Sequence, residues 1–312
     1  MQKETAIYIY LVFMYGKIFY KKELSLMLEY DRNLALDFQE VSSVVYDSHT
    51  VKDINYLSPC GGTVPAYLVV PKTSTPSPAV IFMHPGQGNR KTFLPEAEKL
   101  ALNSVFSLLI DAPFVRGTAP KTPSTERELH YMVEAMTDIQ KYIQTILDIR
   151  RGIDLLSTFN NVDSKQIAYI GHSLGATWGG VLAGVEKRIK AYILMAGFSS
   201  VSMWHKTSDH PLAVLIRNML SEEKFHSFIS ALEPLDAIHY IDKAVPASLF
   251  FQFAYNDEFV SRDQANSFYT NANLPKEIIW YETDHLFTAC DTASEDRIKW
   301  LFKNLGLKLN KQ

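Results

Sequence analysis

Residues 166–186 read QIAYIGHSLGATWGGVLAGVE, and this stretch decides the fold. It begins as an apolar strand-like run, passes through GHSLG at residues 171–175 and continues as a helix-like run. In a Gly-x-Ser-x-Gly turn the chain passes from strand to helix so sharply that side chains at the glycine positions would collide, and the serine hydroxyl is left exposed. The stretch therefore predicts a strand, a tight elbow that carries Ser173 as a nucleophile, and a helix.

The runs around this stretch predict the rest of an α/β fold. The early runs are separated by only a few residues, which suits antiparallel hairpins. From Ala79 onward the runs are apolar almost throughout and each is followed by a helix-length segment, which predicts parallel strands buried on both faces. We expect a mostly parallel, twisted sheet of about eight strands with helices on both faces. The runs that predict strands are Val41 to Asp47, Val51 to Leu57, Val64 to Val70, Ala79 to His84, Val105 to Asp111, Gln166 to Ile170, Ala191 to Ala196, Ser248 to Ala254 and Glu277 to Tyr281.

Two helices are indicated by the spacing of their apolar residues. From Met136 to Ile153, apolar side chains recur at helical spacing with polar residues on the opposite side, which predicts one long amphipathic helix. A last helix is expected over Ser294 to Leu305, where Thr292 and Glu295 resemble a capping box. The chain is therefore expected to close as a helix on the sheet.

Two segments interrupt the alternation of strands and helices. Pro120 to His130 is a connection, and Phe198 to Tyr240 is a long insertion with helical pieces at Leu212 to Leu220 and Phe225 to Leu232. Loops at the carboxyl ends of the strands surround the ligand site in such sheets, so both segments are candidate lids. We expect one α/β domain over residues 41–312, with a cap insertion at about 198–240 and an N-terminal extension over 1–40.

Composition excludes several classes of protein and of binding partner. The 31 basic and 34 acidic residues are scattered and give a net charge of -3, so nucleic acid is not an expected partner. Two cysteines, Cys60 and Cys290, are too few for a disulfide framework or a cysteine-based zinc site.

The apolar stretch Ala6 to Phe19 is too short to span a bilayer, and no small-residue cleavage site follows it. We expect a cytoplasmic protein without stable membrane insertion, with export as the alternative if this stretch acts as a signal.

The base that would activate Ser173 is predicted from chain order. Serine needs a base to take its proton, and in proteins with this elbow the order is serine, acid, histidine. His285 lies just beyond the last predicted strand and is the expected base. His172 sits inside the elbow, but its direction, away from the serine's side, favours a structural role. The remaining histidines fall in the insertion, where a solvent-facing or lid role is the simpler interpretation: His205, His210, His226 and His239.

The acid should follow the preceding strand, and Asp257 comes directly after it. Its neighbour Glu258 would point elsewhere, and Asp242 precedes the strand altogether. Asp284 adjoins His285, and neighbours in an extended loop seldom face one another. Asp257 is therefore expected to hold His285 in the correct tautomer.

An oxyanion site is expected at two backbone positions. The first free N–H of the helix after the elbow, that of Leu174, lies where an oxyanion would form. The second donor should come from the loop after the strand that leads the parallel part, where residues 84–88 read HPGQG. Closely spaced glycines let backbone N–H groups approach a ligand, so Gly86 or Gln87 is the expected donor.

With these motifs in place, the chain resembles the α/β-hydrolase superfamily, and within it the branch of dienelactone-hydrolase-like and acetyl-xylan-esterase-like proteins, which includes the catalytic domain of prolyl oligopeptidases. The resemblance covers roughly residues 40–306. Its motifs are HPGQG, IDAPFVRG at 110–117, Val162-Asp163 with GHSLG, NDEFV at 256–260 and DHLF at 284–287. It implies a triad of Ser173, Asp257 and His285 and an acyl-enzyme mechanism that needs no metal or organic cofactor.

The departures from this family pattern refine the expected activity. True dienelactone hydrolases use a cysteine nucleophile, whereas this elbow carries Ser173, so hydrolysis of a small carboxylic ester is the expected function. Pro85 stands where relatives commonly place glycine, which leaves the identity of the loop's oxyanion donor open. The alternatives are a small peptidase or amidase and a ligand-binding protein that keeps the fold without turnover. An oligomer is compatible with the sequence.

Overall fold

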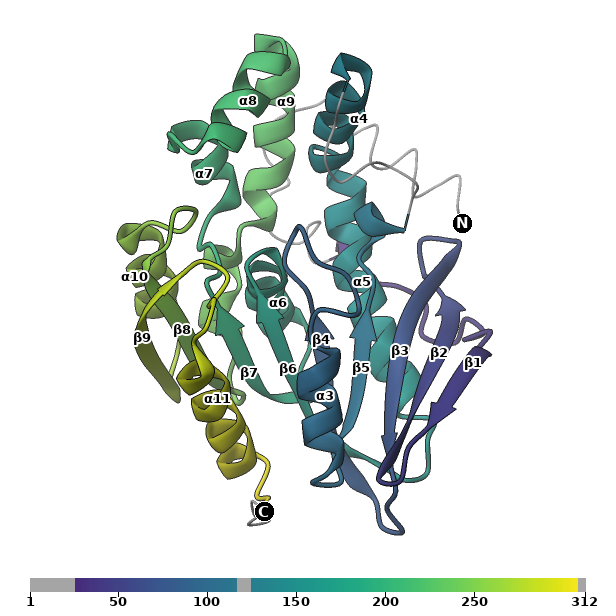
Figure 1. Cartoon of the computed structure of the whole chain (residues 1–312). Coiled ribbons are helices and arrows are strands. Elements are labelled where there is room, and N and C mark those ends of the chain that lie inside the picture. Colours follow the sequence, from purple (N-terminus) through teal and green to yellow (C-terminus); the bar gives the residue numbers. More distant parts are fainter. Residues whose placement is uncertain (1–25, 117–124, 308–312) are drawn as a thin grey trace.

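The computed structural model describes residues 26–116 and 125–307. Its centre is a nine-stranded sheet in the order β1-β2-β3-β5-β4-β6-β7-β8-β9 (Figure 1). The expected α/β architecture is confirmed, with nine strands where about eight were expected. The strands are β1 (Gln39–Val45), β2 (His49–Leu57), β3 (Thr63–Pro71), β4 (Ser77–Met83), β5 (Phe106–Ile110), β6 (Val162–His172), β7 (Ile189–Met195), β8 (Ser248–Asn256) and β9 (Lys276–Asp284).

The sheet changes from antiparallel to parallel along the chain. β1, β2 and β3 form an antiparallel meander, and β3 also runs antiparallel to β5. From β5 across to β9 every neighbouring pair is parallel. Strands β4 and β5 are buried at every position, which accounts for their uniformly apolar sequence. The predicted antiparallel beginning and parallel remainder are both confirmed.

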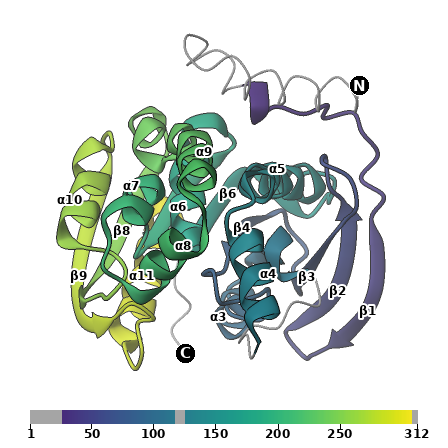
Figure 2. The same ribbon diagram turned by 90° about the horizontal axis from the view of Figure 1, so that it is seen from above.

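Helices cover both faces of the sheet and enclose two apolar cores (Figure 2). One core joins the sheet to α5, α6 and α10 through side chains such as Ile146, Val181 and Phe268. The other joins it to α3 and α11 through side chains such as Leu100 and Leu301. The helices are α3 (Leu94–Ala101), α5 (Ile139–Leu156), α6 (Leu174–Val185), α10 (Arg262–Asn271) and α11 (Asp291–Asn304).

Two predicted helix boundaries are wrong. The single helix expected from Met136 to Ile153 is two helices, α4 (Glu126–Met136) and α5, because Asp138 accepts a hydrogen bond from the backbone N–H of Gln140 and starts a new helix there. Residues 126–130, expected in a connection, therefore belong to α4. Helix α11 begins at Asp291, before the expected capping box, so Thr292 lies inside its first turn.

The insertion stands above the carboxyl ends of the parallel strands, beside α4 (Figure 1). Its two predicted helical pieces correspond to α8 and α9, and α7 was not expected. Short 3₁₀ turns then lead back to β8, and another, η1 (Pro113–Val115), follows β5. The elements of the insertion are α7 (Val201–Thr207), α8 (Pro211–Met219), α9 (Glu222–Leu232), η2 (Glu233–Leu235), η3 (Ala237–His239) and η4 (Ile241–Lys243).

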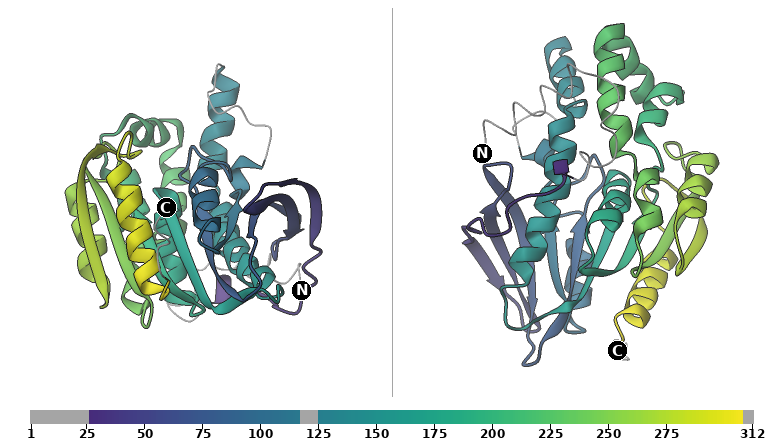
Figure 3. Two further views of the ribbon diagram at one scale, coloured as in Figure 1. Left: turned by 60° about the horizontal axis from the view of Figure 1, so that its bottom comes forward. Right: turned by 180° about the vertical axis from the view of Figure 1, so that it is seen from behind.

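The first described residues lie against α5, as the rear view of Figure 3 shows. Arg150 of α5 donates to the carbonyl of Leu28, and Arg151 donates to the carbonyl of Arg32 at 3.2 Å and to that of Leu34. The Tyr30 hydroxyl donates to the Asp154 carboxylate at 2.7 Å. Residues 28–34 are therefore attached to the domain by main-chain carbonyls as well as by side chains.

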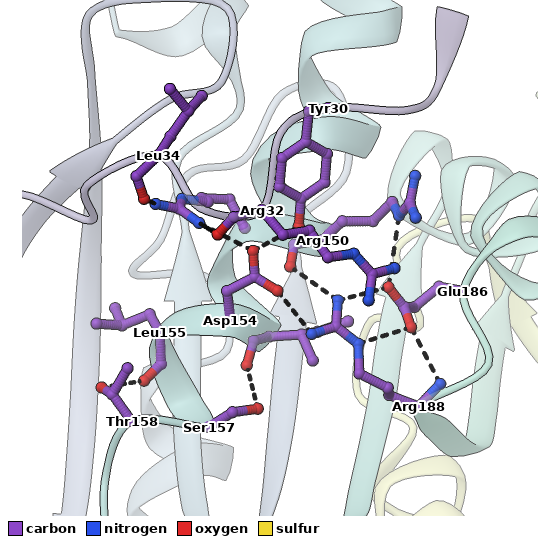
Figure 4. A network of polar contacts seen from close by, with 12 residues as sticks. Tyr30, Arg32, Leu34, Arg150, Asp154, Leu155, Ser157, Thr158, Glu186 and Arg188 are labelled. Atoms are coloured by element: carbon purple, nitrogen blue, oxygen red, sulfur yellow. Dashed lines mark hydrogen bonds and ion pairs between the residues drawn. The ribbon is translucent and has the colours of Figure 1, made fainter. Parts of the chain in front are cut away.

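The same network continues to the C-terminal end of α6 (Figure 4). Arg188 pairs with Asp154 at 2.6 Å and with Glu186 at 2.7 Å. Burial acts to raise the pKa of Glu186, but hydrogen bonds and charge from Arg188 outweigh it and hold this pKa below its ordinary value. The network thus joins the N-terminal segment, α5 and the connection between α6 and β7.

Part of the N-terminal extension expected over 1–40 lies outside the described residues, including the apolar stretch Ala6 to Phe19. In the described part of the chain, none of the helices combines the length and apolar character needed to cross a membrane.

Candidate active site

The elbow between β6 and α6 has the tight geometry that its sequence predicts. Ser173 has φ +56° and ψ -118°, a backbone conformation that a non-glycine residue rarely adopts. A Cβ on Gly171 would lie 2.4 Å from the carbonyl oxygen of Gly175, and one on Gly175 would lie 2.3 Å from that of Met83. Only glycine fits at either position, because β6, α6 and the end of β4 meet there.

The predicted nucleophile, base and acid lie in one hydrogen-bonded chain. The Ser173 Oγ is 2.8 Å from the His285 Nε2, and the His285 Nδ1 is 2.8 Å and 2.9 Å from the two carboxylate oxygens of Asp257. A carboxylate can only accept, so Nδ1 carries the proton and Nε2 is free to accept from the serine hydroxyl. The side chains of His285 and Asp257 are only 4% and 2% exposed, so little water competes for these bonds.

The loop after β8 orients the Asp257 carboxylate. Its Oδ1 accepts hydrogen bonds from the backbone N–H groups of Phe259 and Val260, each at 2.8 Å. Because these donors come from the same short loop, the carboxylate cannot turn away from His285 without losing them. The acid is therefore fixed by local backbone as well as by the imidazole.

The three other carboxylates considered as acids lie elsewhere. Glu258 is exposed, and Asp242 is exposed in η4. Asp284 accepts a hydrogen bond from the backbone N–H of Thr288 at 2.9 Å, and such backbone hydrogen bonds lower its pKa. The Asp284 carboxylate is thus bound within its own loop and does not face the neighbouring imidazole.

The histidines of the insertion do not share one environment. His226 and His239 are exposed, as expected. His205 is buried within the insertion, which excludes the solvent-facing alternative for it, and burial together with Arg217 lowers its pKa to about 4. His210 caps α8, since its Nδ1 accepts from the backbone N–H of Leu212 at 3.1 Å.

Aromatic rings that sequence reasoning missed surround the imidazole of His285. The Phe259 ring lies 4.6 Å from it, between centroids, and the His210 ring lies 4.1 Å from Phe259 on the side of the insertion. Trp204 of α7 packs near the same ring, at 6.4 Å. Phe259 follows the predicted acid by two residues, but no pattern in the sequence indicates that its ring reaches the histidine.

The expected oxyanion loop lies against the start of α6. A Cβ on Gly86 would be 3.1 Å from the Leu174 Cδ1, so this loop and the first residue of the helix are in contact. His84 braces the loop, because its Nδ1 donates to the Pro85 carbonyl at 2.7 Å while its Nε2 accepts from the Ala112 N–H at 3.1 Å. Gly86 thus lies beside the side chain of Leu174, and Gln87, the next residue of the loop, is exposed.

This arrangement can carry out nucleophilic chemistry. A hydroxyl, an imidazole and a carboxylate are joined at the carboxyl edge of a parallel sheet, where the N-terminus of α6 offers a positive dipole end. A proton can pass from the Ser173 Oγ to the His285 Nε2 as the oxygen attacks, and Asp257 would stabilise the resulting imidazolium.

One comparison with known proteins shows the family of the chain. A model of the dienelactone hydrolase family matches residues 64–299. No curated protein matches the sequence.

Several solved structures share the fold at low sequence identity. The acetyl xylan esterase from Paenibacillus sp. R4 is similar with a TM-score of 0.76 and 18% identity, over 93% of this chain and 96% of that one. Acetyl xylan esterase 1 from Thermoanaerobacterium sp. JW/SL YS485 has a TM-score of 0.70 and 15% identity, over 90% and 92%. A cold-adapted esterase from an Arctic intertidal metagenomic library has a TM-score of 0.60 and 14% identity, over 85% and 97%.

Proposed function

Because the chain belongs to the dienelactone hydrolase family, we propose that it is a serine hydrolase that cleaves a carboxylic ester through an acyl-enzyme intermediate. One observation carries the proposal: the unbroken chain of hydrogen bonds from the Ser173 Oγ through both nitrogens of His285 to Asp257. The resemblance that the motifs indicated is confirmed at the level of the family.

Acylation begins with proton transfer. His285 Nε2 takes the proton of the Ser173 hydroxyl as its oxygen attacks the ester carbonyl carbon, and the carbonyl oxygen becomes an oxyanion. The imidazolium then gives this proton to the alcohol oxygen as the bond between that oxygen and the carbonyl carbon breaks. The alcohol leaves, and the acyl group stays bound to Ser173.

Deacylation repeats the same steps with water. His285 takes a proton from a water molecule, whose oxygen attacks the acyl carbon and forms a second oxyanion. The proton then returns to the Ser173 oxygen as its bond to the acyl carbon breaks, which releases a carboxylic acid and restores the hydroxyl. The buried His285 and Asp257 side chains support both steps, because their hydrogen bond is shielded from solvent.

The oxyanion formed in each step would be held by backbone N–H groups. Leu174 is the first residue of α6, where the helix leaves N–H groups without partners in the helix. Gly86 or Gln87 supplies the second donor in this proposal, and the contact of the Gly86 position with Leu174 supports it.

Carboxylic esters other than dienelactones, which are cyclic esters, are favoured as substrates by the identity of the nucleophile. This elbow carries a serine, and the similar solved structures include two acetyl xylan esterases. A small ester is therefore the substrate class that we propose, and a matched anilide tests the amidase alternative.

The experiment uses p-nitrophenyl esters of rising chain length with the wild type and Ser173→Ala. We expect turnover of the best ester to fall by a factor of about 10⁴ to 10⁶ in the variant, because loss of a serine nucleophile removes the covalent route. Ser164→Ala is the matched control, since Ser164 is exposed on the same strand, near its other end. A fluorophosphonate probe should label the wild type and the control, but not Ser173→Ala. Undiminished hydrolysis by Ser173→Ala would overturn the proposal.

A further inference from the structure

We propose that His172, the residue before the nucleophile, is a positioning residue that holds the His285 loop at the correct distance from Ser173. The inference rests on the proposed function and adds a residue to it. His172 is only 4% exposed, and it ends β6 directly before the elbow. A structural role was expected for it, and the structure gives that role a specific target.

The contact is a hydrogen bond to the backbone of the predicted base. His172 Nε2 lies 2.7 Å from the carbonyl oxygen of His285. A carbonyl can only accept, so Nε2 carries the proton and the ring is held in one tautomer. His172 therefore forms a hydrogen bond with the main chain of residue 285 and leaves the His285 imidazole free to contact Ser173 and Asp257.

Ring contacts add to this hydrogen bond. The rings of His172 and His285 are 5.3 Å apart between centroids and tilted by 36°, and Phe287 meets His172 edge-on at 5.8 Å. Phe259 lies against the His285 ring at 4.6 Å. The imidazole of His285 is thus packed by two further rings, of which only His172 adjoins the nucleophile in the sequence.

The loop that carries His285 needs such support. Phe287 and Ala289 both have positive φ, +57° and +52°, which is unfavourable for residues other than glycine. Within the loop, the Phe287 N–H donates to the Asp284 carbonyl at 3.1 Å, and the Thr288 N–H donates to the Asp284 carboxylate at 2.9 Å. These bonds hold the loop's shape, but they do not fix its place relative to Ser173. The bond from His172 joins the loop to the end of β6, directly before the nucleophile.

Charge is compatible with this role. Burial and the nearby His285 and Arg297 lower the pKa of His172 to about 4, although the His285 carbonyl and Asp257 act in the other direction. His172 is therefore neutral at neutral pH. A second positive charge beside the imidazolium of the transition state is avoided.

Three substitutions separate the hydrogen bond from the shape of the side chain. His172→Gln places an amide N–H near the position of Nε2 and keeps the donor. His172→Asn is also a neutral amide, but it is one methylene shorter and does not reach the carbonyl. His172→Phe keeps a ring and removes the donor.

We expect kcat to fall by a factor of about 10 to 100 in His172→Phe and His172→Asn, because misplacement of a catalytic group by about 1 Å has an effect of this order. KM should change little, since the His172 side chain is only 4% exposed, and the rate of fluorophosphonate labelling should fall with kcat. His172→Gln should recover most of both rates. Thermal unfolding of each variant is measured alongside.

The outcomes are distinct. If His172→Phe and His172→Asn fold and keep wild-type kcat, or if His172→Gln is as slow as His172→Asn at equal thermal stability, His172 does not position the loop. If His172→Phe does not fold, the pair of amide variants decides the question by the same criterion. A wild-type protein that neither hydrolyses esters nor reacts with the probe would instead remove the proposed function, and the inference with it.

Discussion

At the scale of single residues, the carboxylate of Asp257 determines which nitrogen of His285 carries the proton. It lies within 2.9 Å of Nδ1 through both of its oxygens, and an ionised carboxylate accepts only. The proton is therefore on Nδ1, and Nε2 faces Ser173 as a base. An amide in place of the carboxylate would turn a donor toward Nδ1 and favour the opposite tautomer.

Asp257→Asn tests this arrangement. The variant keeps the size of the side chain and should lower kcat by a factor of about 10⁴ with little effect on KM, because the wrong nitrogen of His285 is protonated. Steady-state kinetics on the best p-nitrophenyl ester gives the measurement. Glu258→Gln, one residue further along the chain and exposed, serves as the control and should keep wild-type kcat. Equal activity of Asp257→Asn and the wild type would show that another group orients His285.

The sequence could predict these three residues because parallel strands bring their carboxyl ends to one edge. Ser173, Asp257 and His285 each follow a different apolar run, and chain order then separates Asp257 from Asp242. The roles of Phe259 and His172 could not be read in this way. They depend on where a ring and a carbonyl meet in space, and no spacing along the chain encodes that.

At the scale of elements, the insertion above the carboxyl ends of the parallel strands is held in place where it leaves and rejoins the domain. Asp236, near its end, accepts hydrogen bonds from the hydroxyls of Ser200 and Ser202 at 2.6 Å and 2.5 Å, and from the Ser202 N–H at 3.1 Å. Gln264 of α10 also bonds the backbone N–H and carbonyl of Ser200. The first helix of the insertion is therefore tied both to its return segment and to the body of the protein.

Asp236→Ala removes the hydrogen bonds that Asp236 accepts from Ser200 and Ser202. We expect a loss of about 2 to 4 kcal/mol in the free energy of unfolding, because buried donors are left without an acceptor. Burial raises the pKa of Asp236 above its ordinary 3.8, so its stabilising contribution is largest below that pH and declines as the pH rises through the raised pKa. The deficit of the variant should therefore widen in acid.

Hydrogen exchange measured by mass spectrometry locates the effect. Peptides from residues 198–240 should exchange faster in Asp236→Ala, whereas those from β6 and β7 should be unchanged. Asp242→Ala, at an exposed aspartate of the neighbouring turn η4, is the control and should match the wild type. Uniformly faster exchange across the whole protein would contradict a local fastening.

The helices were predicted correctly where the spacing of apolar residues reflects burial. Their ends were predicted wrongly where a capping residue determines the position at which a helix starts or stops. The apolar pieces of α8 and α9 were recognised, because each presents one face to the core. The break between α4 and α5 was missed because Met136 and Ile139 keep helical spacing across it, while the end of one helix and the start of the next depend on Asp138 bonding the N–H of Gln140. Similarly, Thr292 and Glu295 have the spacing of a capping box but lie within α11.

At the scale of the whole molecule, the sheet was predictable and the attachment of the N-terminal segment was not. Uniformly apolar runs such as those of β4 and β5 indicate strands covered on both faces, and the structure covers them with helices on both sides. Residues 28–34 show no such pattern. They are bound largely through their carbonyl groups, which every sequence possesses, so only the arginines of α5 could have hinted at the contact.

Truncation measures how much that attachment contributes. A chain that starts at residue 26 retains every contact of the network in Figure 4, whereas one that starts at residue 37 loses the buried Leu28 side chain and the carbonyls bound by Arg150 and Arg151. Both arginines are 1% exposed, so their charges would be left in the interior with fewer acceptors. Arg150 keeps Glu186 and Arg151 keeps Asp154, but loss of hydrogen-bond acceptors from buried charged groups still costs about 1 to 3 kcal/mol or more, a large part of the about 5 to 15 kcal/mol that stabilises a typical domain.

The chain that starts at residue 37 should therefore unfold at a clearly lower temperature and in less denaturant than the chain that starts at residue 26. Arg151→Met in the shorter chain should recover part of the loss, because an apolar side chain of similar length needs no acceptor there, whereas the same substitution in the longer chain should be destabilising. This reversal of sign distinguishes a buried charge that lacks hydrogen-bond acceptors from a simple loss of packing. If the two truncated chains are equally stable, the contacts of the N-terminal segment with Arg150 and Arg151 do not stabilise the domain, and the prediction is wrong.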